Sequence, residues 1–235
     1  MQRYFVTGKR DDYLILSDGD LHHIKNVMRI LPGEKIECVY EGAVFLCEVE
    51  DLRSLYVKIL KKISNQKNSL GRVSIAVGLV KEQKFDLILQ KLTELGVDEI
   101  IPLKLERSIV KLDEERMLKK QERWKKICKE AAEQSKRSDI PIVSLPICLS
   151  ALVNRDYSEK FVCSTLLNKK LDYDDLHSLD KCATMIFVIG PEGGITEREE
   201  EFLISNGYSP ISFGNQIMRV ETAAIYVASI IHFMK

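Results

Sequence analysis

The residues best suited to chemistry form a glycine-rich turn, Gly190-Pro191-Glu192-Gly193-Gly194. The turn follows the apolar run Met185 to Ile189 and precedes an acidic segment whose start suits a helix cap, with Thr196 and then Glu199 three residues further on. Glycines let a backbone approach a ligand closely, and proline stiffens the turn. A tight strand-to-helix connection without a ligand has the same composition, so glycines alone leave both readings open.

Common nucleotide and nucleophile motifs are absent from the sequence. It contains no Gly-x-Gly-x-x-Gly after a first strand, no Gly-x-x-x-x-Gly-Lys-Ser/Thr and no Gly-x-Ser-x-Gly. A phosphate is disfavoured at the turn, because four carboxylates crowd the helix start that follows it: Glu197, Glu199, Glu200 and Glu201. A positively charged ligand fits these electrostatics better. S-adenosylmethionine, which carries a sulfonium and an amino group, is such a ligand.

A second stretch, Phe213 to Ala224, repeats the pattern of strand end, loop and helix. Glu221 or Thr222 can begin its helix, and Arg219 comes just before. In an open parallel sheet, ligands bind where strands end at their carboxyl edges. We therefore expect this stretch to lie on the same edge of one sheet as Gly190.

The elements that must position these turns divide the chain in two. The first 68 residues are rich in short strand-like runs separated by turn residues, and residues 61–71 are polar and are expected to be a linker. After Gly71, apolar runs alternate with helical spacing, which predicts a mostly parallel sheet with helices on both faces. The expected strands are 13–16, 35–40, 43–49, 56–60, 73–80, 100–103, 161–163, 185–189 and 211–213. The expected helices are 22–28, one that Gly96 ends, 113–136 and 221–233.

Apolar residues fall nearly all round the last expected helix, Glu221 to Phe233. Such a helix is buried either inside the fold or against a second subunit. The second alternative predicts a dimer, whereas burial in the core accounts for the pattern equally well.

Composition excludes several classes of protein. The 235 residues have a formal net charge of zero, but residues 104–137 hold twelve basic and seven acidic residues, a local excess of five positive charges that could suit a polyanion. The six cysteines are scattered singly, so neither a zinc site nor disulfides are expected. No run of apolar residues reaches the roughly 18 needed to cross a bilayer, and the first residues do not resemble a signal peptide. We expect a cytoplasmic protein without membrane or metal.

Together, these motifs resemble a known family. Gly-Pro-Glu-Gly-Gly followed by Gly-x-x-Ile-Met-Arg-x-Glu-Thr-Ala-Ala is similar to the SPOUT methyltransferases with a trefoil knot. More narrowly, the chain resembles the RsmE family, which methylates N3 of one uridine in small-subunit (16S) ribosomal RNA. The further matches are His23-Ile24-x-x-Val27-x-Arg29 with Pro32-Gly33-Glu34, Lys91-x-x-Glu94-Leu95-Gly96-Val97, Glu106-Arg107-Ser108 and Glu133-Gln134-Ser135-x-Arg137.

The resemblance implies a PUA-like RNA-binding β-barrel domain at 1–68 and a SPOUT α/β domain with a knot at 72–235. It also implies S-adenosylmethionine held in a bent form by three loops, and a homodimer whose active sites use both subunits. The chain departs from the family where Gln216 replaces the usual arginine and Asn215 the usual proline. Any role of that arginine toward RNA is therefore in doubt here.

The resemblance also suggests roles for individual residues. Uridine N3 must lose a proton before it can attack a methyl group, and Arg219 is expected to stabilise the anion that forms. A phosphate contact, or a salt bridge to Glu221, is the alternative role for Arg219. Glu192 is expected to accept the proton or to hold the cofactor's ammonium group, with a structural role as a third possibility.

The other expected site residues fall into two groups. The cofactor is expected to contact three loops, through Thr165, Leu166, Ile189, Gly190, Gly193, Gly194, Phe213, Gly214, Ile217, Met218 and Thr222. Ribosomal RNA is expected to contact cations at loop and helix ends, namely Arg29, Lys84, Arg107, Lys136 and Arg137.

Two other functions remain open. The first keeps the enzyme class but moves the methyl group to a ribose 2′-oxygen or to transfer RNA. The second is an RNA-binding assembly factor that has lost turnover, for which Gln216 is the only hint; the intact Arg219-x-Glu221-Thr222 argues against it.

Overall fold

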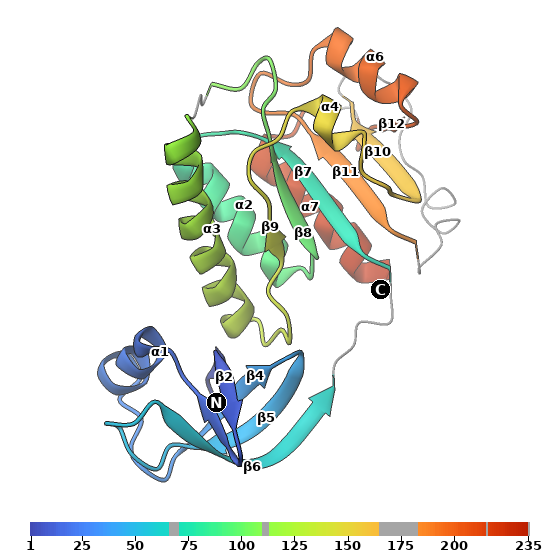
Figure 1. Cartoon of the computed structure of the whole chain (residues 1–235). Coiled ribbons are helices and arrows are strands. Elements are labelled where there is room, and N and C mark those ends of the chain that lie inside the picture. Colours follow the sequence, from blue (N-terminus) through green and yellow to red (C-terminus); the bar gives the residue numbers. More distant parts are fainter. Residues whose placement is uncertain (66–70, 110–112, 165–182, 215, 235) are drawn as a thin grey trace. The chain divides into compact units, whose positions relative to one another are not determined.

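The computed structural model describes residues 1–65, 71–109, 113–164, 183–214 and 216–234 (Figure 1). The chain forms two compact units. The first contains Met1–Asn68 and Lys129–Ile140, and the second contains Ser69–Cys128 and Pro141–Lys235. Each unit has its own six-stranded sheet and its own apolar core.

The sheet of the first unit is mostly antiparallel, and its strands follow the order β1-β4-β5-β6-β3-β2. Only β1 and β4 pair in parallel. Alternate residues of these strands face a core that includes Tyr4, Leu14, Ile36 and Val57. The strands are β1 (Arg3–Phe5), β2 (Gly8–Arg10), β3 (Tyr13–Ile15), β4 (Lys35–Tyr40), β5 (Ala43–Glu48) and β6 (Tyr56–Asn65). The expected β-rich N-terminal part is confirmed.

Two expectations for this unit are wrong in detail. The helix expected at 22–28 begins earlier, as α1 (Asp18–His22), and continues as a single π-helical segment, η1 (His23–Val27). It starts there because Ser17 and Asp20 form a capping box, in which each side chain accepts a hydrogen bond from the other's backbone N–H. The linker expected from Lys61 begins later, because β6 extends to Asn65 by pairing with β5 across two register shifts.

The sheet of the second unit is entirely parallel among the residues described, in the order β12-β10-β11-β7-β8-β9 (Figure 1). Its central strands read as continuous apolar runs because both faces are covered. The strands are β7 (Val73–Gly78), β8 (Glu99–Leu103), β9 (Ile142–Val143), β10 (Glu159–Cys163), β11 (Met185–Ile189) and β12 (Ser209–Ile211). The expected parallel sheet is confirmed.

Helices cover both faces of this sheet. On one face α2 packs against α7, and on the other α4 and α6 share a core with the strands that includes Leu152, Val162, Ile186 and Leu203 (Figure 1). These helices are α2 (Glu82–Glu94), α4 (Leu149–Leu152), α6 (Glu197–Ser205) and α7 (Val220–Met234). A fifth, α3 (Glu114–Gln134), has its first residues in this unit and its last turns in the first unit. None of the helices in the described part of the chain is both long and apolar enough to cross a membrane.

One detail of the second unit differs from expectation. The strand expected at 211–213 lies two residues earlier, as β12, where Pro210 is tolerated because an edge strand can lack one N–H. The described fold covers one side of helix α7, so burial inside the fold does not by itself account for the apolar pattern of this helix. Its residues Val220, Ala223, Ala224, Val227, Ala228 and Ile231 are buried, but Tyr226 and Phe233 are 41% and 88% exposed.

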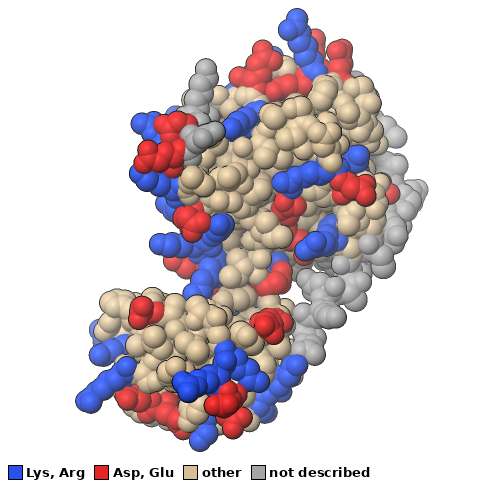
Figure 2. All heavy atoms as spheres, viewed as in Figure 1, with Lys and Arg blue, Asp and Glu red and all other residues tan. Residues whose placement is uncertain are grey.

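The excess of cations in residues 104–137 does not produce an unbroken basic surface. Figure 2 shows blue and red side chains interspersed on the visible face of each unit. On α3, cations pair with acids of the same helix or of α2, as in Lys119–Glu115 at 2.6 Å and Arg123–Asp86 at 2.5 Å. Exposed pairs of this kind contribute little stability, but they cancel much of the local charge.

Candidate active site

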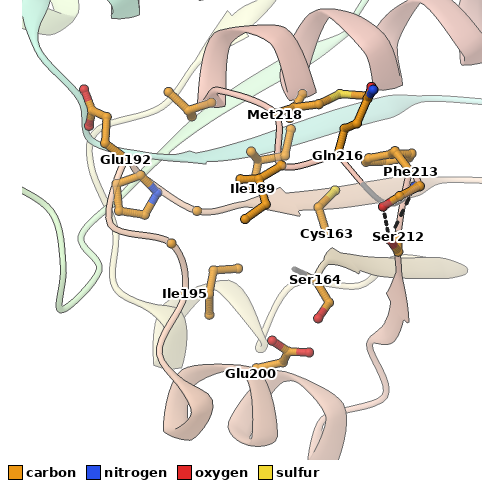
Figure 3. A pocket seen from close by; sticks show the side chains of 17 residues that line it. Cys163, Ser164, Ile189, Glu192, Ile195, Glu200, Ser212, Phe213, Gln216 and Met218 are labelled. Atoms are coloured by element: carbon orange, nitrogen blue, oxygen red, sulfur yellow. Dashed lines mark hydrogen bonds between the residues drawn. The ribbon is translucent and has the colours of Figure 1, made fainter. Parts of the chain in front are cut away.

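A cavity of about 250 Å³ opens at the carboxyl ends of β10, β11 and β12 (Figure 3). Residues from three strand ends and the loops that follow line it: Cys163 and Ser164 at the end of β10, the turn that starts at Gly190 after β11, and the loop that starts at Ser212 after β12. The glycine turn and the stretch that ends in α7 thus lie on one sheet edge, as predicted. This is the edge at which parallel sheets bind ligands.

The glycine turn packs so closely that a side chain fits neither at Gly190 within it nor at Gly78 beneath it. A Cβ atom at Gly190 would lie 2.9 Å from the Gly194 carbonyl carbon and the Ile195 nitrogen. At Gly78, the last residue of β7, a Cβ atom would lie 2.6 Å from the nitrogen and Cδ of Pro191. Gly194 itself has φ +73°, a conformation that glycine adopts without strain. The glycines therefore allow the turn to fold back over the end of the neighbouring strand.

The loop after β8 braces this turn. The Arg107 guanidinium donates a hydrogen bond to the Gly193 carbonyl over 3.0 Å, and the Arg107 side chain leaves no room for a Cβ at Gly193. The Glu106 N–H donates to the Glu199 carboxylate over 2.8 Å. Glu199 is also the partner of Thr196 in the capping box that begins α6. The helix cap predicted from the sequence is confirmed, and it also links two loops.

The loop after β12 forms the opposite wall. The Ser212 hydroxyl donates to the Gly214 carbonyl and accepts from its N–H, at 3.3 and 3.4 Å (Figure 3). Gly214 has φ +121°. Beyond it, Met218 is half-buried and Ile217 is 84% exposed, although both line the cavity. An apolar side chain left this open at a cavity mouth is available to contact a ligand.

Two carboxylates face the cavity, and their surroundings differ. Glu192 forms an ion pair with Lys84, with 3.1 Å between the ammonium nitrogen and Oε1. Lys84 therefore occupies the position that the ammonium group of a ligand was expected to take on Glu192. Glu200, on α6, is only 7% exposed, and the structure records no hydrogen bond or ion pair to its carboxylate from any described residue.

Arg219 lies beside the cavity without lining it. It is exposed, and its carbonyl accepts the hydrogen bond from Ala223 that starts α7. Within the described residues, its guanidinium forms no salt bridge to Glu221. That alternative role is therefore not observed, and the phosphate contact stays a prediction. One carboxylate oxygen of Glu221 is buried without a partner among those residues.

The cysteine in the cavity wall is not a candidate nucleophile. Burial raises the pKa of the Cys163 thiol far above its ordinary value, so the sulfur stays protonated. A protonated thiol is a weak nucleophile and acts here as a small apolar side chain. Among the described residues, no group of His, Cys, Asp and Glu side chains is arranged to hold a metal ion.

Most of the expected cofactor residues come together at this cavity. Its lining includes Ile189, Gly190, Gly194, Phe213, Gly214, Ile217 and Met218, and also the expected catalytic residue Glu192. Gly193 and Thr222 lie next to lining residues but do not line the cavity themselves. Thr165 and Leu166 lie outside the described residues. The binding roles of all these residues stay predictions.

The five expected RNA contacts separate into two groups. Lys84 and Arg107 lie in the second unit, where both contact the glycine turn. Arg29, Lys136 and Arg137 belong to the first unit. Arg29 is exposed with φ +52°, Lys136 pairs with Glu37, and Arg137, whose side chain is 8% exposed, pairs with Asp139 at 2.6 Å.

Sequence reasoning did not single out several residues of the cavity wall. Ser164, Ser212 and Glu200 line it, yet none belongs to a recognisable motif. Glu200 had appeared only as one of four glutamates in an acidic helix. Helical spacing offered a signal, because Glu200 and Leu203 lie three residues apart and both are buried on the inner face of α6.

The sequence also matches family models along most of its length. Residues 66–232 match the model of an RNA methyltransferase domain, and residues 16–60 match the model of an RNA methyltransferase PUA domain. The ribosomal RNA small subunit methyltransferase E of Bacillus subtilis (strain 168) is 36% identical over 99% of this chain and 96% of its own length. That of Aquifex aeolicus is 31% identical over 98% of this chain and 99% of its own length. The chain belongs to this family.

Solved structures of family members have the same fold. The ribosomal RNA small subunit methyltransferase E of Neisseria gonorrhoeae, bound to S-adenosyl methionine, matches with a TM-score of 0.87 and 27% identity over 100% of this chain and 98% of its own. The methyltransferase Lpg2936 of Legionella pneumophila, in complex with the same cofactor, matches with a TM-score of 0.88 and 28% identity over 99% and 97%. The α/β fold and PUA domain expected from the resemblance to the small-subunit methyltransferase E family are confirmed, and the knot stays a prediction.

Proposed function

We propose that the chain transfers the methyl group of S-adenosylmethionine to N3 of one uridine in 16S ribosomal RNA. The observation that carries the proposal is the cavity at the carboxyl ends of β10, β11 and β12. In a chain that belongs to the small-subunit methyltransferase E family along its whole length, this cavity is built from the two motifs that mark that family. Solved relatives that hold the cofactor support the same assignment.

The cavity suits this cofactor in shape and charge. Its walls are backbone and apolar side chains at Gly190, Gly194, Ile217 and Met218, which can enclose a nucleoside. The lining residues that the structure describes include two carboxylates and no lysine, arginine or histidine. This favours a cationic ligand over a phosphate. Bound S-adenosylmethionine would supply the methyl group, and the reaction exchanges its sulfur–carbon bond for a bond to N3 with release of the N3 proton.

The proposed role of Arg219 is to favour that release. Its guanidinium stabilises the negative charge that develops on O2 and O4 of the uracil ring, and it remains charged throughout. Three features support this role: the exposed position, the place next to Met218 in the cavity wall, and the lack of an ion-pair partner among the described residues. The proton acceptor is proposed to be Glu192, whose pairing with Lys84 must then loosen when the substrate binds.

The proposed enzyme is a homodimer that uses α7 as its interface. Tyr226 and Phe233 lie on one exposed stripe of this helix, together with Thr222 and Ser229. The Tyr226 ring packs edge-on against Phe213, a cavity residue, with centroids 5.2 Å apart. Burial of this stripe against a second copy would therefore bring that copy next to the cavity. Sedimentation of the purified protein measures the mass, and a monomer at working concentration rules the arrangement out.

A methylation assay tests the function directly. Purified protein is incubated with labelled S-adenosylmethionine and with small ribosomal subunits from a strain that lacks this methylation, and the nucleosides are then analysed. The expected product is 3-methyluridine. Arg219→Ala is expected to lower the rate about a hundredfold, because one preorganised donor to a developing anion is lost. Cofactor affinity is expected to stay unchanged, since Arg219 does not line the cavity.

The control is Arg198→Ala, which removes an exposed arginine of α6 that does not line the cavity. This variant is expected to keep full activity. A 2′-O-methyl product, or label on transfer RNA only, would leave the fold in place and refute the choice of target. Cofactor binding without any transfer would favour the assembly-factor alternative.

A further inference from the structure

Glu200 is the one lining residue of the described cavity that is both charged and without a protein partner. Its residue is 7% exposed, and its carboxylate rises from α6 toward the cavity near Ile195 and Ser164 (Figure 3). The structure records no hydrogen bond or ion pair to this carboxylate from the described residues. Buried charges are normally paired, so an unpaired one that faces a cavity requires an explanation.

The neighbouring carboxylates show that this arrangement is specific to Glu200. Glu199 accepts hydrogen bonds from the N–H groups of Glu106 and Thr196, and Glu192 pairs with Lys84. Glu201, the next residue of α6, is exposed to solvent. Of these four glutamates, Glu200 alone is largely covered by protein, has no recorded partner among the described residues and is directed into the cavity.

The charge of Glu200 is therefore not compensated by the walls of the cavity. Lys84 neutralises the other lining carboxylate, and the described lining contains no cation. The first turn of a helix moderates the cost of a carboxylate but does not replace a partner. In the ligand-free protein, no described residue of the cavity wall balances this charge. A ligand that places a positive charge beside Glu200 gains an attraction that a ligand without that charge does not gain.

We propose that Glu200 selects for the positive charge of the cofactor, so that the cavity prefers S-adenosylmethionine to the demethylated product S-adenosylhomocysteine. The two molecules differ by the methyl group and by the charge of the sulfonium. The product has one positive charge fewer, so it gains less from Glu200. The residue thereby favours release of the product after transfer. This inference rests on the proposed function and adds a specificity-determining residue to it.

The test compares Glu200→Gln with Glu201→Gln by calorimetry and by thermal unfolding. Glutamine keeps the shape of the side chain and removes its charge, while Glu201→Gln removes the same charge from the exposed side of the helix. In Glu200→Gln the affinity for S-adenosylmethionine is expected to fall about tenfold, as for a lost charged partner, and the affinity for S-adenosylhomocysteine much less. The ligand-free variant is expected to melt no lower than the wild type, because Glu200 has no recorded protein partner to lose.

The ratio of the two affinities distinguishes ligand selection from a structural role. A residue that only supports the fold would lower the melting temperature when changed and would leave the ratio of the two affinities unaltered. An unchanged ratio in Glu200→Gln overturns the inference, whether or not both affinities fall, because a contact to a group that both molecules share, such as the amino-acid ammonium, would weaken them equally. Failure of the wild-type chain to bind either molecule would instead refute the proposed function. Glu201→Gln is expected to change neither ratio nor melting temperature.

Discussion

Two regions of this chain differ in whether their charged side chains have partners within the protein. In the stretch Glu133 to Arg137, the first unit pairs each charge internally. Glu133 accepts a hydrogen bond from the Phe5 N–H at 3.2 Å and lies 3.6 Å from Lys129, while Lys136 pairs with Glu37 and Arg137 with Asp139. At the cavity of the second unit, Glu200 and Arg219 have no such partners among the described residues.

The difference shows how a charged residue can be assigned a structural or a ligand-binding role. The sequence alone expected ligand contacts in both regions, at Lys136 and Arg137 in the first unit and at Arg219 in the second. Where every charge has an intramolecular partner, substitution should change stability first. Where a charge is buried or directed outward without a partner, substitution should change binding or catalysis first. Of the variants that follow, Glu133→Gln and Arg107→Ala test this division, and Gly78→Ala tests the backbone that shapes the cavity.

The largest effect is expected from Gly78→Ala, which acts on the cavity through backbone alone. The added methyl group would lie 2.6 Å from the backbone nitrogen of Pro191, closer than real side chains approach, so the glycine turn must shift. Affinity for S-adenosylmethionine, measured by calorimetry, is expected to fall about a hundredfold.

The control for this variant is Gly19→Ala in α1. The nearest atom to a Cβ at that position is the Ser17 hydroxyl at 3.8 Å, an ordinary contact, so affinity should be unaffected. Normal cofactor affinity in a folded Gly78→Ala protein would show that the cavity tolerates movement of the turn. That result would show that cofactor binding does not depend on the close packing of the turn.

Much of the fold was predictable because its signals are local. Continuous apolar runs identified the buried parallel strands β7 and β11, and Thr196 with Glu199 identified the start of α6. The errors came where a tertiary contact decides the outcome. Strand β6 extends through polar residues because β5 pairs with it, and β12 includes Pro210 because it lies at the sheet edge.

The site was predictable at its glycines and less so at its charges. Gly190 has no room for a side chain and Gly214 has φ +121°, so both positions favour glycine, and both line the cavity. The partner of a charge depends on distant residues, so the pairing of Lys84 with Glu192, residues that are far apart in the chain, left no trace in sequence spacing. For the same reason, the four glutamates between positions 197 and 201 did not reveal that Glu200 is the buried one.

The pH dependence of stability tests the internally paired region. Burial raises the pKa of Glu133 from 4.5 to about 7, although Lys129 and the Phe5 N–H oppose the shift. The folded chain therefore holds this proton more tightly than the unfolded chain, and the free energy of unfolding falls as pH rises from 4.5 to about 7. Glu133→Gln is expected to remove roughly 3 kcal/mol of that fall, measured by urea unfolding across this range.

The matched control is Glu130→Gln, an exposed acid of α3 in the same unit, which should leave the pH profile unchanged. Cofactor affinity should be the same in both variants. A Glu133→Gln protein with an unaltered pH profile but reduced RNA binding would show that the stretch Glu133 to Arg137 contributes to RNA binding and not to stability.

The smallest loss of cofactor affinity is expected from a change at Arg107. This residue was expected to bind RNA, yet its guanidinium has a hydrogen-bond partner inside the protein. Its guanidinium holds the Gly193 carbonyl at 3.0 Å, so Arg107→Ala should loosen the glycine turn and weaken cofactor binding about tenfold. Arg107→Lys, which keeps a donor of similar length, should restore part of this loss. Lys104→Ala, an exposed cation of the same loop, should have no such effect.

Salt dependence separates this positioning role from a contact to RNA. A cation that binds phosphate lowers affinity for every RNA when it is removed and flattens the dependence of binding on salt. If Arg107 positions the turn, Arg107→Ala changes cofactor affinity and leaves the salt dependence of RNA binding as it was. If cofactor affinity is unchanged and the salt dependence flattens, Arg107 binds RNA although it also has a partner inside the protein. An internal hydrogen bond or ion pair would then not be sufficient evidence that a charged residue has a purely structural role.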